Sequence, residues 1–125
     1  MAISIATTLR NTRADAITTF AGTSAKLRIY TASYAALLVE CVCSASALAS
    51  AASGGVLTLN AISAGTATGA GTAAIARILK SDGSTMVIEG LTVGTSGANI
   101  NLTNTSIAVN DTVTITSATI TEGNA

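Results

Sequence analysis

Alternating apolar and polar positions run through most of the chain and predict short β-strands. In the segment 25–31, Leu27 and Ile29 alternate with charged and aromatic residues, which is typical of a strand with one buried face. Similar runs, rich in the Thr, Val and Ile that suit a pleated surface, lie at 37–43, 56–62, 85–91, 99–103, 106–109 and 112–121. We expect antiparallel strands here, separated by loops rich in small residues at 44–55 and 63–71.

The segment 72–80 has features of both a helix and a strand. Its Ala, Arg, Leu and Lys residues are good helix formers. However, Asp82-Gly83 follows directly and the β-branched run 85–91 comes next. Asp-Gly between two apolar runs is the strongest short-range signal for a hairpin. We therefore expect 72–80 to be a strand paired with 85–91, with a helix as the alternative.

The last expected strand, 112–121, changes its alternation part-way along. Its apolar residues are Val113 and Ile115 in the first half and Ala118 and Ile120 in the second. Successive side chains of a strand point to opposite faces, so one straight strand cannot place all four on one face. We expect a bulge near Thr116-Ser117, or a strand that packs against apolar partners on both faces.

One helix is expected near the N-terminus, at residues 7–21. Leu9, Ala16, Ile17 and Phe20 recur at helical spacing, which predicts one apolar stripe. Thr7 or Thr8 is suited to cap the start, and Gly22 follows the last expected helical residue, where glycine is favoured. We expect the stripe to pack on the sheet or on a neighbouring subunit.

The composition indicates one domain with an unusually uncharged surface. The chain has 125 residues and a formal net charge of zero, and charged residues make up 10%, against about 25% in a typical soluble domain. Either a permanent assembly covers much of the surface, or Thr, Ser and Asn keep it polar. The balanced charge gives no general attraction to nucleic acid or to an anionic membrane.

No segment has the pattern of a membrane span or of an export signal. No run of about 20 strongly apolar residues occurs. The first residues, Met1-Ala-Ile-Ser-Ile5, lack the basic and apolar regions of a secretory signal. We expect the protein to be made and used in a cytoplasm, or in particles that assemble there.

Residues suited to catalysis or metal binding are scarce. The chain has no His, which excludes Ser-His and Cys-His nucleophilic sites and imidazole metal ligands. Cys41 and Cys43 would point the same way from one strand, about 6.6 Å apart, which is poor geometry for a disulfide. Buried free thiols are expected, with bridging between subunits as the alternative. We expect no catalytic residue, no metal and no cofactor.

Two further patterns have an ordinary explanation. Gly69-Ala-Gly71-Thr-Ala-Ala74 matches a dinucleotide-binding motif, but the expected strand before it ends near Ile62 and no second βαβ unit follows, so we expect a loop. Four cations, Arg10, Arg13, Lys26 and Arg28, could form a basic patch that faces an acidic partner. The alternative is a solvated surface, and without interleaved aromatic residues they do not indicate nucleic-acid binding.

Several short blocks resemble a family of small virion structural proteins from tailed bacteriophages. The blocks are spread over nearly the whole chain, in the family's order: Ala25-Lys-Leu-Arg-Ile-Tyr30, Gly54-Gly-Val-Leu-Thr-Leu-Asn-Ala-Ile62, Gly94-Thr-Ser-Gly-Ala-Asn-Ile-Asn-Leu102, Thr105-Ser-Ile107 and Thr119-Ile-Thr-Glu-Gly-Asn-Ala125. The chain departs from the family at Ile75 and Ala76, where members often carry aromatic residues, and in a longer Ala-rich segment at 44–53.

The resemblance implies a mainly β protein, an antiparallel, jelly-roll-like β-sandwich at 25–125 preceded by a segment 1–22 with one short helix. It implies a capsid decoration or cement protein, a homotrimer on the capsid surface that binds the major capsid protein after assembly in the host cytoplasm. The alternatives are a tail, adaptor or fibre-associated component, and a glycan- or receptor-binding module. Since an N-terminal helix reaches a neighbour easily, the candidate partner contacts are Leu9, Arg10, Arg13, Ile17 and Phe20.

Overall fold

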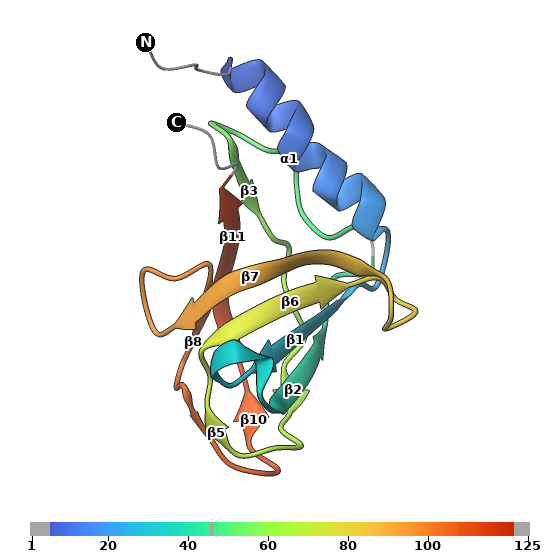
Figure 1. Ribbon diagram of the computed structural model, residues 1–125. Coiled ribbons are helices and arrows are strands. Elements are labelled where there is room, and N and C mark those ends of the chain that lie inside the picture. Colours follow the sequence, from blue (N-terminus) through green and yellow to red (C-terminus); the bar gives the residue numbers. More distant parts are fainter. Residues whose placement is uncertain (1–5, 46, 122–125) are drawn as a thin grey trace.

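The computed structural model describes residues 6–45 and 47–121 and shows a mainly β protein with one α-helix near its N-terminus (Figure 1). The expected fold class is therefore confirmed. Met1–Ile5 and the last four residues of the block that ends at Ala125 lie outside the described residues. The elements in chain order are α1 (Thr7–Ala21), β1 (Lys26–Tyr30), η1 (Ala32–Tyr34), β2 (Leu37–Val42), β3 (Val56–Thr58), β4 (Gly65–Thr66), β5 (Gly71–Thr72), β6 (Ile75–Leu79), β7 (Met86–Gly94), β8 (Ile100–Leu102), β9 (Ser106–Ile107), β10 (Thr112–Val113) and β11 (Ile115–Thr121).

Most strands belong to one curled seven-stranded sheet, with the order β2-β1-β6-β7-β8-β11-β3. Every neighbouring pair in it is antiparallel except β7 and β8, which are parallel. Two small sheets, β10-β4 and β5-β9, complete the strands. In Figure 1, α1 lies at one end of the molecule beside β3 and β11, and the small sheets lie at the opposite end.

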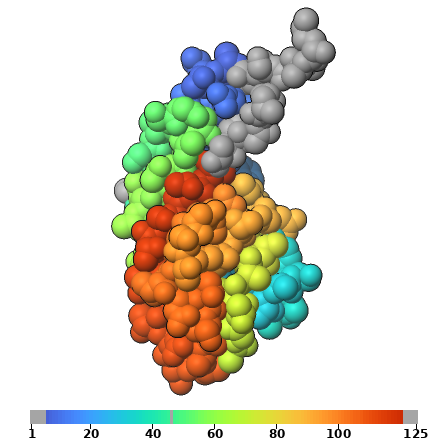
Figure 2. Space-filling view, turned by 90° about the vertical axis from the view of Figure 1, so that its left-hand side faces the viewer, coloured from blue at the N-terminus to red at the C-terminus, as the bar shows by residue number. Residues whose placement is uncertain are grey.

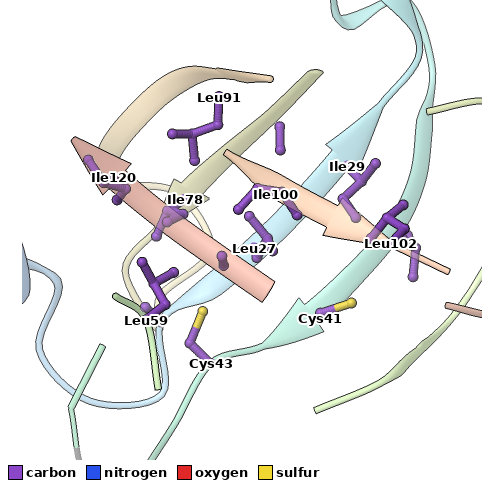
Figure 3. Close-up of a cluster of buried hydrophobic side chains, with 14 of the residues drawn as sticks. Leu27, Ile29, Cys41, Cys43, Leu59, Ile78, Leu91, Ile100, Leu102 and Ile120 are labelled. Atoms are coloured by element: carbon purple, nitrogen blue, oxygen red, sulfur yellow. The ribbon is translucent and has the colours of Figure 1, made fainter. Parts of the chain in front are cut away.

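The core lies between the two halves of the curled sheet. Figure 3 shows aliphatic side chains of β1 and β6 meeting those of β8 and β11. Leu27, Ile29, Ile78 and Ile100 are fully buried, as the alternation in 25–31 predicts for the first two. Because the chain has few aromatic residues, Ile, Leu, Val, Ala and the two Cys residues fill this space. No buried polar or charged residue occurs in the described chain.

The hairpin expected at Asp82-Gly83 is confirmed. β6 and β7 pair antiparallel across it, so 72–80 contains a strand and no helix. The Asp82 carboxylate accepts hydrogen bonds from the N–H groups of Ser84 (2.8 Å) and Thr85 (2.9 Å) and from the Thr85 hydroxyl (2.6 Å). These bonds, above all the one from the Thr85 hydroxyl, favour the ionised form and lower the pKa of Asp82.

The expected bulge in the last strand is also confirmed. β11 pairs with β8 through Ile115 opposite Leu102 and Ser117 opposite Asn101, so Thr116 is the additional residue. The additional residue reverses the alternation, so that even-numbered side chains after the bulge point to the face that odd-numbered side chains occupy before it. As a result Ala118 and Ile120 are buried, and Ile115 packs partly against the same core.

The helix has the expected bounds, but its cap and its buried face differ from the expectation. Ala6 occupies the N-cap position with no side-chain cap hydrogen bond, so the expectation of a Thr7 or Thr8 cap was wrong. The buried residues of the helix are Ala14 and Ala21. Their small side chains let the helix backbone approach the body closely, which Leu9 and Phe20 on that face would prevent.

Polar side chains fasten α1 to the loop before β3. Asp15 accepts a hydrogen bond from the N–H of Ala52 (2.7 Å), and Asn11 accepts one from the N–H of Gly55 (2.8 Å). Both bonds satisfy loop backbone donors that no strand pairs. They hold the helix in a fixed orientation, and its opposite face is left exposed.

Candidate functional site

The exposed face of α1 carries an apolar stripe that the fold does not use. We call Leu9, Ala16 and Phe20 the outer stripe. At about 100° per residue, Leu9 and Ala16 each lie within about 40° of Phe20 around the helix axis, and Ala14 and Ala21 lie more than about 90° from it. Leu9 is 51% exposed and Phe20 is 49% exposed. The helix therefore has two apolar faces, one against the body and one toward solvent.

A shallow hollow follows the same side of the helix. It has a volume of about 580 Å³ and is lined by Thr12, Asp15, Ala16, Thr19 and Phe20. The Lys80 ammonium lies 4.2 Å from the centre of the Phe20 ring, a cation–π contact that orients the ring without covering it. The hollow and the ring together form a concave surface that is open to solvent.

The structure separates the five expected partner contacts into two groups. Leu9 and Phe20 lie on the outer stripe, and Arg13 is exposed beside them. Ile17 is partly buried and packs against the core. Arg10 lies between α1 and the loop before β3, where its guanidinium contacts Gly55 and donates a hydrogen bond to Thr7 (3.3 Å). Arg10 and Ile17 therefore lie on the side of the helix that faces the rest of the protein, and not on the outer stripe.

The four N-terminal cations do not form one patch. Arg10 and Arg13 are on α1, whereas Lys26 and Arg28 are on β1, where both pair with Glu40. The Arg28 Nε–Glu40 Oε2 distance is 2.6 Å and the Lys26 Nζ–Glu40 Oε1 distance is 3.6 Å. The basic surface expected from the sequence is thus divided between two elements, and Glu40 neutralises one of its four charges.

A row of four charged side chains crosses the outer face of the sheet. Arg28 of β1 stands opposite Glu40 of β2 on one side and opposite Arg77 of β6 on the other. The Arg77 guanidinium lies 3.8 Å from the Glu89 carboxylate of β7. In order across the sheet, the row consists of Glu40, Arg28, Arg77 and Glu89. We call it the charge row. Its two central arginines are like charges in directly opposed positions, which disfavours the pair by itself.

Two tyrosines hold Arg77 in place. Its guanidinium carbon lies 4.0 Å from the centre of the Tyr34 ring and 4.9 Å from that of the Tyr30 ring. The rings meet edge to face at 5.3 Å. The Tyr34 hydroxyl accepts a hydrogen bond of 2.6 Å from the N–H of Gly90. Gly90 has a φ of 79° and lies in a bulge of β7 opposite Arg77. The bulge directs this N–H toward the Tyr34 hydroxyl.

The loop that carries Tyr34 is held in an uncommon backbone conformation. Ser33 and Tyr34 have φ values of 59° and 57°, in the left-handed region that non-glycine residues seldom adopt. Such conformations persist where surrounding contacts over-determine them, and they cluster at functional sites. Here the contacts are those of the Tyr34 ring with Arg77 and of its hydroxyl with Gly90.

The Glu40 carboxylate is expected to contribute a pH-dependent part of the stability. The Arg28 side-chain hydrogen bond, followed by the charges of Arg28 and Lys26, lowers the pKa of Glu40 against the opposing effect of burial. A lowered folded-state pKa stabilises the fold above the unfolded value of about 4.3 and ceases to do so as the pH falls through the folded value. Because the pair is partly exposed, we expect at most about 1 kcal/mol at pH 7.

The measurement is urea denaturation of the wild type and of Glu40→Gln between pH 3 and pH 7. The difference in unfolding free energy should be present at pH 7 and vanish below about pH 4. Glu89→Gln is the control, since its carboxylate is 56% exposed and lies farther from its arginine. A difference for Glu40→Gln that is constant with pH would contradict the ion-pair explanation.

Comparison with known proteins does not assign this chain to a family. No protein-family model, curated protein or solved structure matches it. In the described ranges, 6–45 and 47–121, no three His, Cys, Asp or Glu residues gather as a metal site would require. Over the same ranges, no helix has the length and apolar character needed to cross a membrane.

Cys41 and Cys43 are free and buried, as expected. Burial raises the pKa of both thiols, that of Cys43 to about 12, so neither is a nucleophile at neutral pH. The glycines of the dinucleotide-like motif serve close packing instead. Gly69 lies against the Leu37 carbonyl and Gly71 against Thr31, where a side chain would collide. The strand β6 follows the motif in place of the helix that dinucleotide binding requires.

Proposed function

We propose that the protein is a structural component of a tailed-bacteriophage virion, a capsid decoration or cement protein. It binds across neighbouring copies of the major capsid protein and acts as a homotrimer on the capsid surface, after synthesis in the host cytoplasm. It performs no reaction. Its effect comes from surface that is buried between subunits and so resists their separation.

The observation that carries this proposal is the outer stripe. Fully burying a Leu or Phe side chain contributes about 1.5–3 kcal/mol, and about half of each remains exposed here. Binding a partner therefore gains roughly 1 kcal/mol from each. The hydrogen bonds of Asn11 and Asp15 keep α1 oriented before binding, so little ordering cost opposes that gain. Repeated over the many copies on a shell, a modest gain per site becomes large.

The distribution of charge also supports a role in an assembly. Residues 91–121 form much of one face of the molecule (Figure 2), and Asp111 is the only charged residue among them. The scarcity of charge on this face is a feature that it has in common with interface centres. The resemblance of the short sequence blocks to small phage virion proteins is the reason for naming a virion as the assembly.

The test is addition of the purified protein to phage heads that lack it. The wild type should bind and raise the temperature at which the heads break open. Leu9→Glu and Phe20→Gln should each weaken binding about tenfold, since a tenfold change corresponds to about 1.4 kcal/mol. Both replacements suit their places in the helix, because an acid is favourable in the first turn and Gln is a good helix former.

The matched control is Val42→Gln, which also exchanges an exposed apolar side chain for a polar one. Val42 is 43% exposed and is the last residue of β2, outside both α1 and the face formed by residues 91–121. This variant should bind as the wild type does. Failure of the wild type to bind heads would refute the decoration role, and labelling that places it on the tail would select the tail-component alternative.

A further inference from the structure

At the centre of the charge row, three cations face two carboxylates. Arg28 uses its Nε–H on Glu40, which Lys26 also approaches. Arg77 has only the Glu89 carboxylate, at 3.8 Å, which is too long for a hydrogen bond. Glu89 is 56% exposed and is therefore held weakly. The cluster Lys26, Arg28 and Arg77 with Glu40 and Glu89 has a net charge of +1.

The guanidinium of Arg77 is held in place, and its hydrogen-bond donors are not used within the described chain. Its Nε is fully buried and has no hydrogen-bond partner. Its guanidinium makes no hydrogen bond within the described chain, although the group has five N–H donors. The side chain is 24% exposed, so the terminal N–H groups are the part that can meet a ligand. Tyr30 and Tyr34 contact the Arg77 guanidinium through their ring faces. An edge of the guanidinium group remains for two parallel hydrogen bonds to a planar anion.

The register places a second arginine beside the first. Arg28 and Arg77 are opposed residues of β1 and β6, so their guanidinium groups extend from the same face of the sheet. An anion between them would bond to the free edge of Arg77 and reduce the repulsion between the two charges. A single carboxylate meets both requirements.

We propose that this centre binds a carboxylate side chain of an acidic protein segment. Arg77 occupies the face of each tyrosine ring beside this centre, so a sugar ring bound to Arg77 could not stack there, and this favours a peptide over an acidic glycan. Lys26 lies two residues before Arg28 on β1, on the same face of the sheet, and extends the positive surface along that strand. This site is separate from the outer stripe and does not depend on the proposed virion role.

The arginine side chains provide a direct measurement. The chain contains four, Arg10, Arg13, Arg28 and Arg77, so four Nε–H signals are expected in a nitrogen–proton correlation spectrum of the labelled full chain. Titration with a capped tetraglutamate peptide should shift the Arg77 and Arg28 signals saturably. The Arg10 and Arg13 signals should stay in place, as should all four with a capped tetraglutamine peptide. Equal shifts of all four signals, or none, would overturn the proposal.

Three variants and a second ligand complete the test. Arg77→Gln should weaken peptide binding at least fivefold, as read from the Arg28 signal, whereas Arg13→Gln should leave it unchanged. Arg77→Lys should recover only part of the affinity, because an ammonium keeps the charge but loses the edge that the tyrosines orient. Sodium glucuronate should bind more weakly than the peptide. A stronger response to glucuronate would overturn the proposal in favour of an acidic sugar.

Discussion

Replacing Leu27 by alanine is expected to lower the free energy of unfolding by about 2–5 kcal/mol. Leu27 is fully buried in the middle of β1, opposite Cys41 on one side and Ile78 on the other. Both sheet halves contribute to its surroundings (Figure 3), so the cavity cannot close without moving several strands. A loss of this size is a large part of the stability of a domain of this length, which is about 5–15 kcal/mol.

The matched variant is Leu9→Ala, which removes the same atoms from the outer stripe. Because Leu9 is 51% exposed and packs against no core residue, its loss should change the unfolding free energy by less than about 0.5 kcal/mol. Denaturation of both variants in urea provides the comparison. If Leu9→Ala were as destabilising as Leu27→Ala, the outer stripe would belong to the core and would not be a partner surface.

The second large effect is expected for Gly65→Ala, with a loss of about 1–3 kcal/mol. Gly65 is buried in β4, and an added Cβ would lie 2.6 Å from the carbonyl oxygen of Glu40 and 2.8 Å from Cγ2 of Val39. β2 is held by β1 on its other side, so this backbone cannot move away without breaking the sheet. The loop that covers the edge of β2 should separate from it.

Gly94→Ala is the control for the loss of glycine itself. An added Cβ at Gly94 would meet Ala98 at 3.4 Å, an ordinary contact, and its backbone has no positive φ. Its effect on the unfolding free energy should be neutral or slightly stabilising, because alanine restricts the unfolded chain. Thermal unfolding separates the two. Equal melting temperatures for the two variants would show that β4 does not pack closely on β2.

Period-two alternation located the strands because each has one face against the core. It placed β1, the Asp82-Gly83 hairpin signal placed β6, and the change of parity in 112–121 located the bulge at Thr116. The parallel pairing of β7 and β8 was not predictable, because it depends on how far the long β7 continues past the hairpin before the chain turns. Local pattern carries no information on that distance.

For α1 the hydrophobic pattern predicted the bounds of the helix correctly and its buried face wrongly. Apolar size singled out Leu9 and Phe20, but the buried residues are Ala14 and Ala21. Alanine does not stand out in a hydrophobic pattern, although it permits close packing. Asn11 and Asp15 looked like solvated residues and instead bind the loop before β3. The use of this face depends on a loop about 40 residues away in the chain.

The charge row could not be found from sequence at all. Arg28 and Arg77 are far apart in the chain and meet only through the pairing of β1 with β6. Tyr34 reaches Arg77 through a backbone conformation that no residue in 32–34 makes necessary. The signal for such a site would be two arginines in opposed positions of neighbouring strands, and it can be recognised only once the register between β1 and β6 is known.

The most direct test of the partner surface is hydroxyl-radical footprinting of Phe20 in the free protein and in assembled particles. Leu37 of β2, which is 38% exposed and lies outside α1, serves as the internal reference. We expect Phe20 to be oxidised readily in the free protein and to be protected at least fivefold in the particle, relative to Leu37. Equal oxidation of Phe20 in both states would contradict the claim that α1 is held by the fold in order to present its outer stripe to a partner.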